Sequence, residues 1–202
     1  MANDPTSVRT IGIVVFDDVE ELDAIGPWEV LAFWAGMWPD DGWRVTTLSP
    51  DGGLVRCAKG LRLTPDHSFA DAPPLAVVLH PGGQGTRPQL VDGAHLEQVR
   101  AWAADAELMT SVCTGSLVYA AAGLLAGRPA TTHWASLDHL ARLDGSIAVR
   151  PEDRYVDDGD VVTSAGVSAG IDMALHLVVR LAGAERARQV RRGIQYDPAP
   201  PV

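Results

Sequence analysis

Short hydrophobic runs alternate along this sequence with longer amphipathic segments. The runs are rich in Val, Ile and Leu and end in polar or glycine-containing turns, which is typical of buried β-strands. They cover 9–16, 75–79 and 108–112, with shorter ones inside 129–134 and 154–166. The amphipathic segments predict helices at 27–37, 92–105, 115–127, 135–143, 169–183 and 184–194. Strands that alternate with helices in this way predict an α/β fold, in which helices sandwich a mainly parallel sheet.

Two further segments have the pattern of exposed strands. Residues 43–50 alternate between hydrophobic and polar positions, and residues 53–69 predict a β-hairpin that turns at Lys59-Gly60. A second turn is expected at Asp158-Gly159, between two strands. Pro27 is suited to the first position of a helix, so we place a helix start there.

The chain of 202 residues has the length of one domain. It contains no repeat, linker or low-complexity segment, so we expect a single domain over 1–202. Residues 1–8 are expected to form a flexible leader. The prolines that recur after Gln195 exclude a regular helix at the end of the sequence.

Charge and composition narrow the class of protein. The net charge is −10 and the sequence pI is about 4.9, which argues against nucleic acid or an anionic membrane surface as a partner. No window resembles a transmembrane span, and the first residues lack the pattern of a signal peptide. Two cysteines, Cys57 and Cys113, make no disulfide framework. We therefore expect a cytoplasmic protein with free thiols.

Candidate chemistry follows the predicted parallel strands. Ligands of such sheets bind at the carboxyl ends of the strands, so the residues after each strand should share one edge. By this reasoning the edge gathers Asp23, Gly82, Gly83, Cys113, Thr114, His133 and Gly166. This convergence points to a small-molecule site better than any single residue does.

Cys113 stands where a strand gives way to a helix. Small residues two positions before and after it, Ser111 and Gly115, meet the steric requirement of a nucleophile elbow. A helix N-terminus favours thiolate over thiol, and the amide of Thr114 can point at developing charge. The alternative is a buried structural cysteine, which is how we interpret Cys57.

The other candidates have weaker signals. Asp23 is interpreted either as a helix-entry cap or as a carboxyl group drawn into a pocket for proton transfer. His133 is interpreted as a base for Cys113 or, more simply, as a packed histidine beside Trp134, and His80 as a residue that hydrogen-bonds locally. No histidine has metal-ligand spacing, so we predict no metal. The glycines at 82, 83 and 85 make neither a dinucleotide fingerprint nor a P-loop.

Four motifs together resemble the ThiJ/PfpI superfamily, over nearly the whole chain and in order. They are GIVVFDDVEELDAIGPWEVL, PGGQGT, TSVCTGSLVYAAAGLLAGRPATTHW and AGVSAGIDMALHLV. The resemblance implies a flavodoxin-like, class I glutamine amidotransferase-like fold with its cysteine at the elbow. Within the superfamily, LDxxGPxxVL, AGID and the YxPAPP tail resemble the isocyanide hydratase branch.

This branch implies a hydro-lyase that converts an isocyanide to an N-substituted formamide without a cofactor. Carried over by position, Cys113 is the nucleophile, Asp23 the proton-transferring carboxyl group and Thr114 a neighbour that shapes the site. Gly82, Gly83 and Gly166 would bind substrate or donate to an oxyanion, with His133 nearby. The superfamily also implies a homodimer.

Two other functions stay open. Thr114 stands where peptidase-like members have histidine, and Asp23 where deglycases or glyoxalases usually have glutamate, which makes those activities weaker interpretations. A cysteine-based small-molecule or redox sensor is the non-enzymatic alternative. Sensor domains of AraC-type regulators carry similar motifs, but the sequence runs to Val202 without a DNA-binding module.

Overall fold

The computed structural model describes residues 8–198, so all but the last residue of the expected leader at 1–8 and the end of the proline-containing tail lie outside the described residues. The strands are β1 (Arg9–Val14), β2 (Trp43–Ser49), β3 (Val55–Arg56), β4 (Arg62–Leu63), β5 (His67–Ser68), β6 (Val77–His80), β7 (Leu108–Val112), β8 (Pro129–Ala130), β9 (Ala148–Val149), β10 (Tyr155–Asp157) and β11 (Val161–Ser164). The α-helices are α1 (Glu21–Met37), α2 (Thr86–Gln89), α3 (Gly93–Asp105), α4 (Gly115–Ala121), α5 (Leu137–Leu143), α6 (Ala169–Ala182) and α7 (Ala184–Gly193). Short 3₁₀ turns cover Pro39–Asp41 and Trp134–Ser136.

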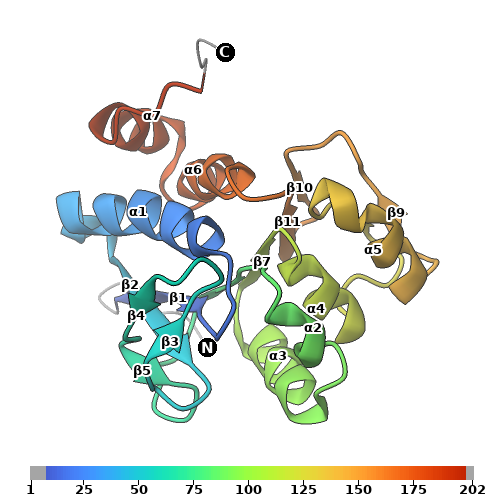
Figure 1. The fold of residues 1–202 in the computed structure, drawn as a ribbon. Helices are drawn as coiled ribbons and strands as arrows, with labels where there is room; N and C mark the ends of the chain where they lie inside the picture. Colours follow the sequence, from blue (N-terminus) through green and yellow to red (C-terminus); the bar gives the residue numbers. More distant parts are fainter. Residues whose placement is uncertain (1–7, 199–202) are drawn as a thin grey trace.

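A sheet of seven strands forms the centre of the molecule, in the order β10-β11-β7-β6-β1-β2-β5. Every neighbouring pair in this sheet is parallel except β10 and β11. Helices α1, α6 and α7 cover one face, and α2, α3 and α4 cover the other (Figure 1). The predicted α/β sandwich is confirmed, because both faces of the sheet are covered by helices.

The strand and helix patterns are explained by burial. All five residues of β7 are buried, and β6 and β11 are buried throughout, as expected of strands covered on both faces. The hairpin is confirmed as the antiparallel pair β3–β4, with Lys59-Gly60 between its strands. The second turn is confirmed between β10 and β11.

Three sequence-based expectations are wrong. Helix α1 begins at Glu21 instead of Pro27, so Pro27 and Asp23 both lie inside the helix. Helix α4 ends at Ala121, because Gly123 and Gly127 take left-handed φ angles of 86° and 71°. Strand β8 pairs with β9 in a separate two-stranded sheet, not with the central sheet.

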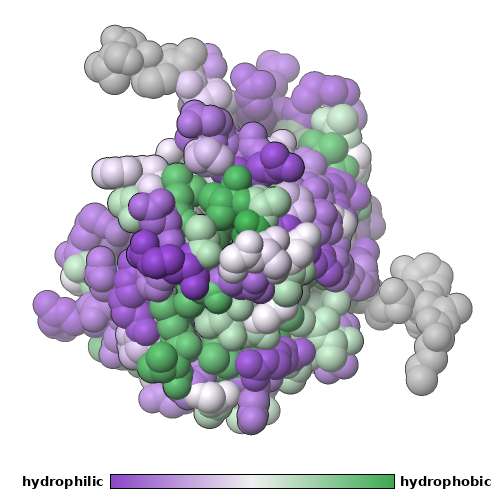
Figure 2. All heavy atoms as spheres, turned by 90° about the vertical axis from the view of Figure 1, so that its right-hand side faces the viewer, coloured by the Kyte–Doolittle hydropathy of each residue, from purple (hydrophilic) through white to green (hydrophobic). Residues whose placement is uncertain are grey.

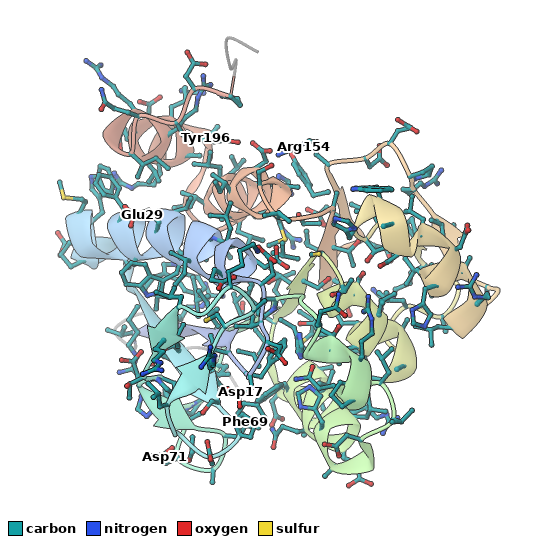
Figure 3. All side chains as sticks on the ribbon, in the orientation of Figure 1. Asp17, Glu29, Phe69, Asp71, Arg154 and Tyr196 are labelled. Carbon is teal, nitrogen blue, oxygen red and sulfur yellow. The ribbon has the colours of Figure 1, made fainter. Side chains whose placement is uncertain are left out.

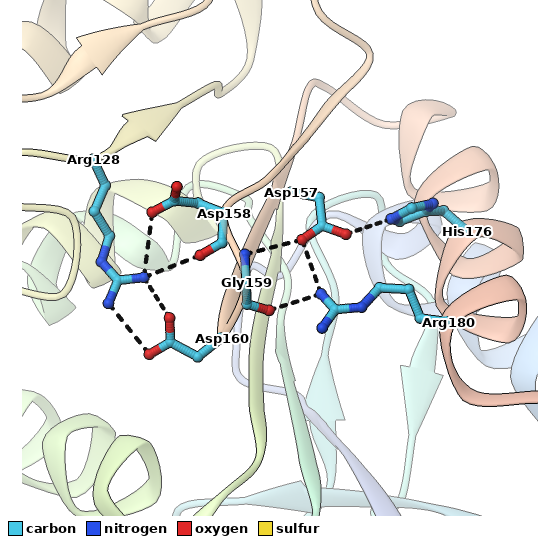
Figure 4. A network of polar contacts seen from close by, with 7 residues as sticks. All are labelled: Arg128, Asp157, Asp158, Gly159, Asp160, His176 and Arg180. Carbon is cyan, nitrogen blue, oxygen red and sulfur yellow. Dashed lines mark hydrogen bonds and ion pairs between the residues drawn. The ribbon is translucent and has the colours of Figure 1, made fainter.

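The turn between β10 and β11 holds α6 in place from the side (Figure 4). Asp157 accepts hydrogen bonds from His176 at 2.6 Å and Arg180 at 2.9 Å, both on α6. On the other side of the turn, Arg128 pairs with Asp158 and Asp160. The carboxylates of this turn therefore connect α6 to the segment that precedes β8.

No helix among residues 8–198 is long and hydrophobic enough to cross a membrane. The surface seen from the side of α5 and β9 is largely hydrophilic, with hydrophobic residues gathered in patches between the polar ones (Figure 2). Cys57 is a free, buried cysteine next to the β3–β4 hairpin, in agreement with its interpretation as a packing residue.

Candidate active site

Cys113 occupies a strained turn between β7 and α4. Its φ is 57°, a left-handed value that side-chain-bearing residues rarely adopt and that is typical of a nucleophile elbow. A Cβ at Gly115 would collide with the carbonyl oxygen of His80, so only glycine fits there. The Cys113 carbonyl accepts hydrogen bonds from Thr132 Oγ1 at 2.9 Å and Ser116 Oγ at 3.1 Å. These bonds hold the backbone in the strained conformation.

The thiol of Cys113 is 5% exposed. Burial raises its pKa to about 12, with a further increase from the charge of Asp23 and a hydrogen bond to it. Backbone amides of Thr114 and Val167 oppose this increase by hydrogen-bonding the sulfur. The expectation of a stable thiolate is therefore wrong for the free protein, because loss of solvation exceeds the effect of the helix terminus. In the free protein the elbow therefore holds a neutral thiol.

Asp23 comes from the first turn of α1 and is 0% exposed. Its Oδ2 accepts a hydrogen bond from the Gly82 amide at 3.1 Å. Burial raises the pKa of Asp23 to about 7, while hydrogen bonds from Cys113 and Gly82 hold it lower than burial alone would. Its Oδ1 is buried and has no conventional hydrogen-bond partner among the residues that the structure describes. Asp23 therefore has one anchored oxygen and one oxygen available for proton transfer.

The glycine turn after β6 connects Asp23 to Thr114. Gly82 donates to Asp23, and the Gly83 amide donates to Thr114 Oγ1 at 3.0 Å. Glycine is required at both positions: a Cβ at Gly82 would lie 2.5 Å from the Thr114 nitrogen, and Gly83 has a φ of 121°. Both amides already have acceptors inside the protein. The structure thus gives them a positioning role in place of the free oxyanion donors that the sequence led us to expect.

Gly166 and His133 approach the site from another side. A Cβ at Gly166 would clash with the His133 ring, so the two lie in close contact. His133 is half-buried, its Nδ1 accepts the Ala135 amide at 3.2 Å, and its ring lies 5.4 Å from that of Trp134, which is 76% exposed. Since Nδ1 is engaged locally and the described residues show no hydrogen bond between His133 and Cys113, His133 is not placed as its base. The simpler interpretation, a histidine packed beside Trp134, fits better.

Val167 is a residue of the candidate site that the sequence did not reveal. It has a φ of 51°, and its amide reaches the Cys113 sulfur from the loop between β11 and α6. Every residue except proline has a backbone amide, so no residue type signals this role. Its only trace in the sequence is the neighbouring Gly166, which was selected for its position after a strand.

A buried histidine pair lies below the elbow. His80 Nδ1 donates to the Pro81 carbonyl at 2.9 Å, in agreement with the expected local hydrogen bond, and its Nε2 lies 3.1 Å from Nε2 of His95. Burial lowers the pKa of His80 to about 3, so this ring is neutral at physiological pH. Among the described residues, no group of three His, Cys, Asp or Glu side chains is arranged to hold a metal ion.

Comparisons with known proteins agree with this geometry. The DJ-1/PfpI family profile matches residues 9–180. An isonitrile hydratase of Pseudomonas putida is 45% identical over 191 residues, which cover 95% of this chain and 80% of the relative. The HTH-type transcriptional regulator GbdR of Pseudomonas aeruginosa is 30% identical over 94% of this chain but only 51% of its own length. A crystal structure of a ThiJ/PfpI family protein from Pseudomonas syringae superimposes with a TM-score of 0.86 at 32% identity, covering 100% of this chain and 81% of that one.

Proposed function

We propose that this chain, which belongs to the DJ-1/PfpI family, is an enzyme that hydrates an isocyanide to an N-substituted formamide. The observation that carries the proposal is the pairing of the elbow thiol of Cys113 with the fully buried carboxyl group of Asp23. The 45% identity to an isonitrile hydratase supports the choice of substrate class. The scheme below needs only water and these side chains.

Asp23 is suited to start the reaction as a base. Its pKa of about 7 leaves much of it ionised near neutral pH, and its unpaired Oδ1 can take the thiol proton. As that proton leaves, the sulfur attacks the terminal carbon of the isocyanide and forms a C–S bond. The Thr114 and Val167 amides stabilise the charge on sulfur while the proton is in transit.

The same proton then completes the adduct. Attack turns the isocyanide carbon into an imidoyl anion, and protonated Asp23 delivers its proton to that carbon. The product of this half-reaction is a thioimidate, R–N=CH–S, on Cys113. One S–H bond and one C–N π bond have been broken, and one C–S and one C–H bond have been formed.

Water releases the product in the second half-reaction. Asp23, ionised again, accepts a proton from a water molecule whose oxygen attacks the thioimidate carbon. The C–S bond breaks, one water proton ends on the nitrogen and the other on the sulfur, and an N-substituted formamide leaves. Exclusion of bulk water by burial protects the thioimidate until the attacking water is positioned.

The decisive assay uses cyclohexyl isocyanide and follows both isocyanide loss by infrared absorption and formamide by mass spectrometry. We expect turnover that is abolished in Cys113→Ala and strongly reduced in Asp23→Asn. Cys57→Ala is the matched control and should keep its activity, because Cys57 is a buried cysteine of the β3–β4 hairpin and not part of the elbow. Turnover without the Cys113 sulfur, or consumption of methylglyoxal in place of the isocyanide, would remove this proposal.

We also propose a homodimer formed through α1 and the β3–β4 hairpin. Leu22, Ile25 and Trp28 of α1 are each more than a third exposed, as are Leu54 and Leu61 beside the hairpin. The hairpin contacts the start of α1 through the Lys59 amide, which donates to Glu21 at 2.6 Å, so these side chains lie on adjoining elements. Sedimentation of the wild type and of Trp28→Glu tests this, with dissociation expected for the variant.

A further inference from the structure

A large groove among the described residues lies away from Cys113. It measures about 950 Å³ and is lined by residues of β10, α6, α7 and the segment that follows α7. Figure 3 labels Arg154 and Tyr196, two of the residues that line this groove. None of the residues that hydrogen-bond the sulfur or the Asp23 carboxyl group lines it. The proposed reaction therefore gives this groove no role.

Aliphatic and aromatic side chains make the inner surface of the groove. Leu175 and Val179 of α6 face Ala187 of α7, and Val179 is 40% exposed. At one end the Tyr155 ring stacks on His176 with centroids 4.7 Å apart. Such a surface suits the hydrocarbon part of a small ligand.

Arginines line the rim of the same groove. Arg188 is paired with Glu185, both about two-thirds exposed, and Arg191 lies 3.9 Å from Asp197, which is 83% exposed. Ion pairs between such exposed groups are weak and are easily exchanged for another anion. Arg191 Nε also donates a hydrogen bond to the Tyr196 carbonyl at 3.1 Å, which holds the guanidinium at the groove. A carboxylate that binds both arginines would replace Glu185 and Asp197 with charge-assisted hydrogen bonds of its own.

Of the two aspartates that line the groove, Asp172 does not compete for such a ligand. Asp172 Oδ2 accepts a hydrogen bond from Arg154 Nε at 2.7 Å, and its Oδ1 accepts one from the Tyr196 hydroxyl at 3.0 Å. Both oxygens are therefore satisfied. Helix α7 adds four arginines and one glutamate, in a chain whose net charge is −10. In the lining of the groove, Arg154, Arg188 and Arg191 outnumber Asp172 and Asp197, and this local excess of positive charge favours an anion.

We propose that the groove is a second small-molecule site, which binds an amphipathic monocarboxylate with its hydrocarbon chain on Leu175 and Val179 and its carboxylate on Arg188 and Arg191. The site is independent of the proposed isocyanide chemistry. It adjoins the start of α6 through Ser168, next to the Val167 amide that reaches the catalytic thiol.

The test is an NMR titration of the protein with octanoate. We expect saturable shifts of α6 and α7 amides with a Kd on the order of 1 mM or tighter, as for a ligand of this size. The double variant Arg188→Gln/Arg191→Gln should bind at least about tenfold more weakly, which corresponds to ~1.4 kcal/mol. Arg192→Gln is the matched control: Arg192 is exposed on the same helix, does not line the groove, and should not change binding.

Further variants and a second ligand distinguish the groove from the catalytic site and from an interface. Cys113→Ala should bind octanoate as the wild type does, and Val179→Trp, which fills the groove from an exposed position, should exclude it. Octan-1-ol should bind more weakly than octanoate. Equal affinity for the alcohol, loss of binding in Cys113→Ala, unchanged binding in the double variant, or no saturation would each overturn the proposal. So would dissociation of a dimer by Val179→Trp, which would make the groove an interface between copies of the chain.

Discussion

Replacing Asp23 by asparagine should make the protein more stable while it removes the proton-transfer group. Asp23 is fully buried, and burial raises its pKa from 3.8 to about 7. Between these two pH values the unfolded chain ionises this residue and the folded protein does not. The free energy of unfolding of the wild type therefore falls as pH rises through that window.

The size of the effect follows from the shift. One pKa unit corresponds to 1.36 kcal/mol, so a change from 3.8 to about 7 destabilises the folded wild type by at most about 4 kcal/mol above pH 7. Asparagine carries no charge and keeps an oxygen to accept the Gly82 amide. We expect Asp23→Asn to be about 2–4 kcal/mol more stable than wild type at pH 8, and equal to it below pH 4. For a chain of this length the gain corresponds to a Tm increase of about 10 °C.

Urea unfolding of both proteins from pH 4 to pH 8 measures this difference. Asp41→Asn is a control of opposite sign: hydrogen bonding to Arg186 lowers the pKa of Asp41, so its loss should destabilise the protein at neutral pH and matter little in acid. Two results would refute our reasoning about the pKa of Asp23. One is that Asp23→Asn is no more stable than wild type at pH 8, and the other is that its gain in the free energy of unfolding is the same at pH 4 as at pH 8.

Three further predictions concern the elbow and its neighbours. The kcat/KM of isocyanide hydration should fall about tenfold per pH unit below pH 7 as Asp23 becomes protonated, and a rate that stays constant down to pH 5 would contradict its role as base. Gly115→Ala should lose activity and about 1–3 kcal/mol of stability, whereas Gly145→Ala, whose Cβ would have nothing within 4 Å, should behave as wild type in both assays. Thr114→Val should destabilise the protein by about 1–3 kcal/mol in urea because the Gly83 amide loses its acceptor, and Thr114→Ser should restore most of the loss.

The local sequence was sufficient to predict an element where its residue types favour a single structure. The junction of strand and helix at 108–115 was predicted correctly because a short, partly β-branched strand, a cysteine and a small residue on each side of it leave few alternatives. The start of α1 was missed because its N-cap residue, Glu20, makes no side-chain capping bond, and because Pro27 resembles a first helical residue. Proline lies inside this helix, which local preference argues against.

The sequence predicted which residues lie together at the candidate site, but it did not predict their hydrogen-bond partners or the direction of the Cys113 pKa shift. The candidate residues lie together because each follows one of three adjacent parallel strands, β1, β6 or β7. The alternation of strands and helices was enough to predict this grouping of Asp23, Gly82, Gly83, Cys113 and Thr114. The acceptors of the two glycine amides are fixed by tertiary contacts, so the sequence could not distinguish a free donor from an occupied one. Desolvation of the thiol is likewise a property of the packed interior, and it reversed the expected direction of the Cys113 pKa.

The glycine turn after β6 affects which substitutions around the candidate site the protein can tolerate. The backbone amides of two successive glycines donate hydrogen bonds, one to Asp23 and the other to Thr114, and neither glycine has a side chain. The relative positions of Asp23 and Thr114 are therefore set by the main chain, and substitution of the surrounding side chains leaves them intact. Substitution of the side chains around the candidate site can therefore change which ligands fit there while the main-chain contacts to Asp23 and Thr114 stay the same.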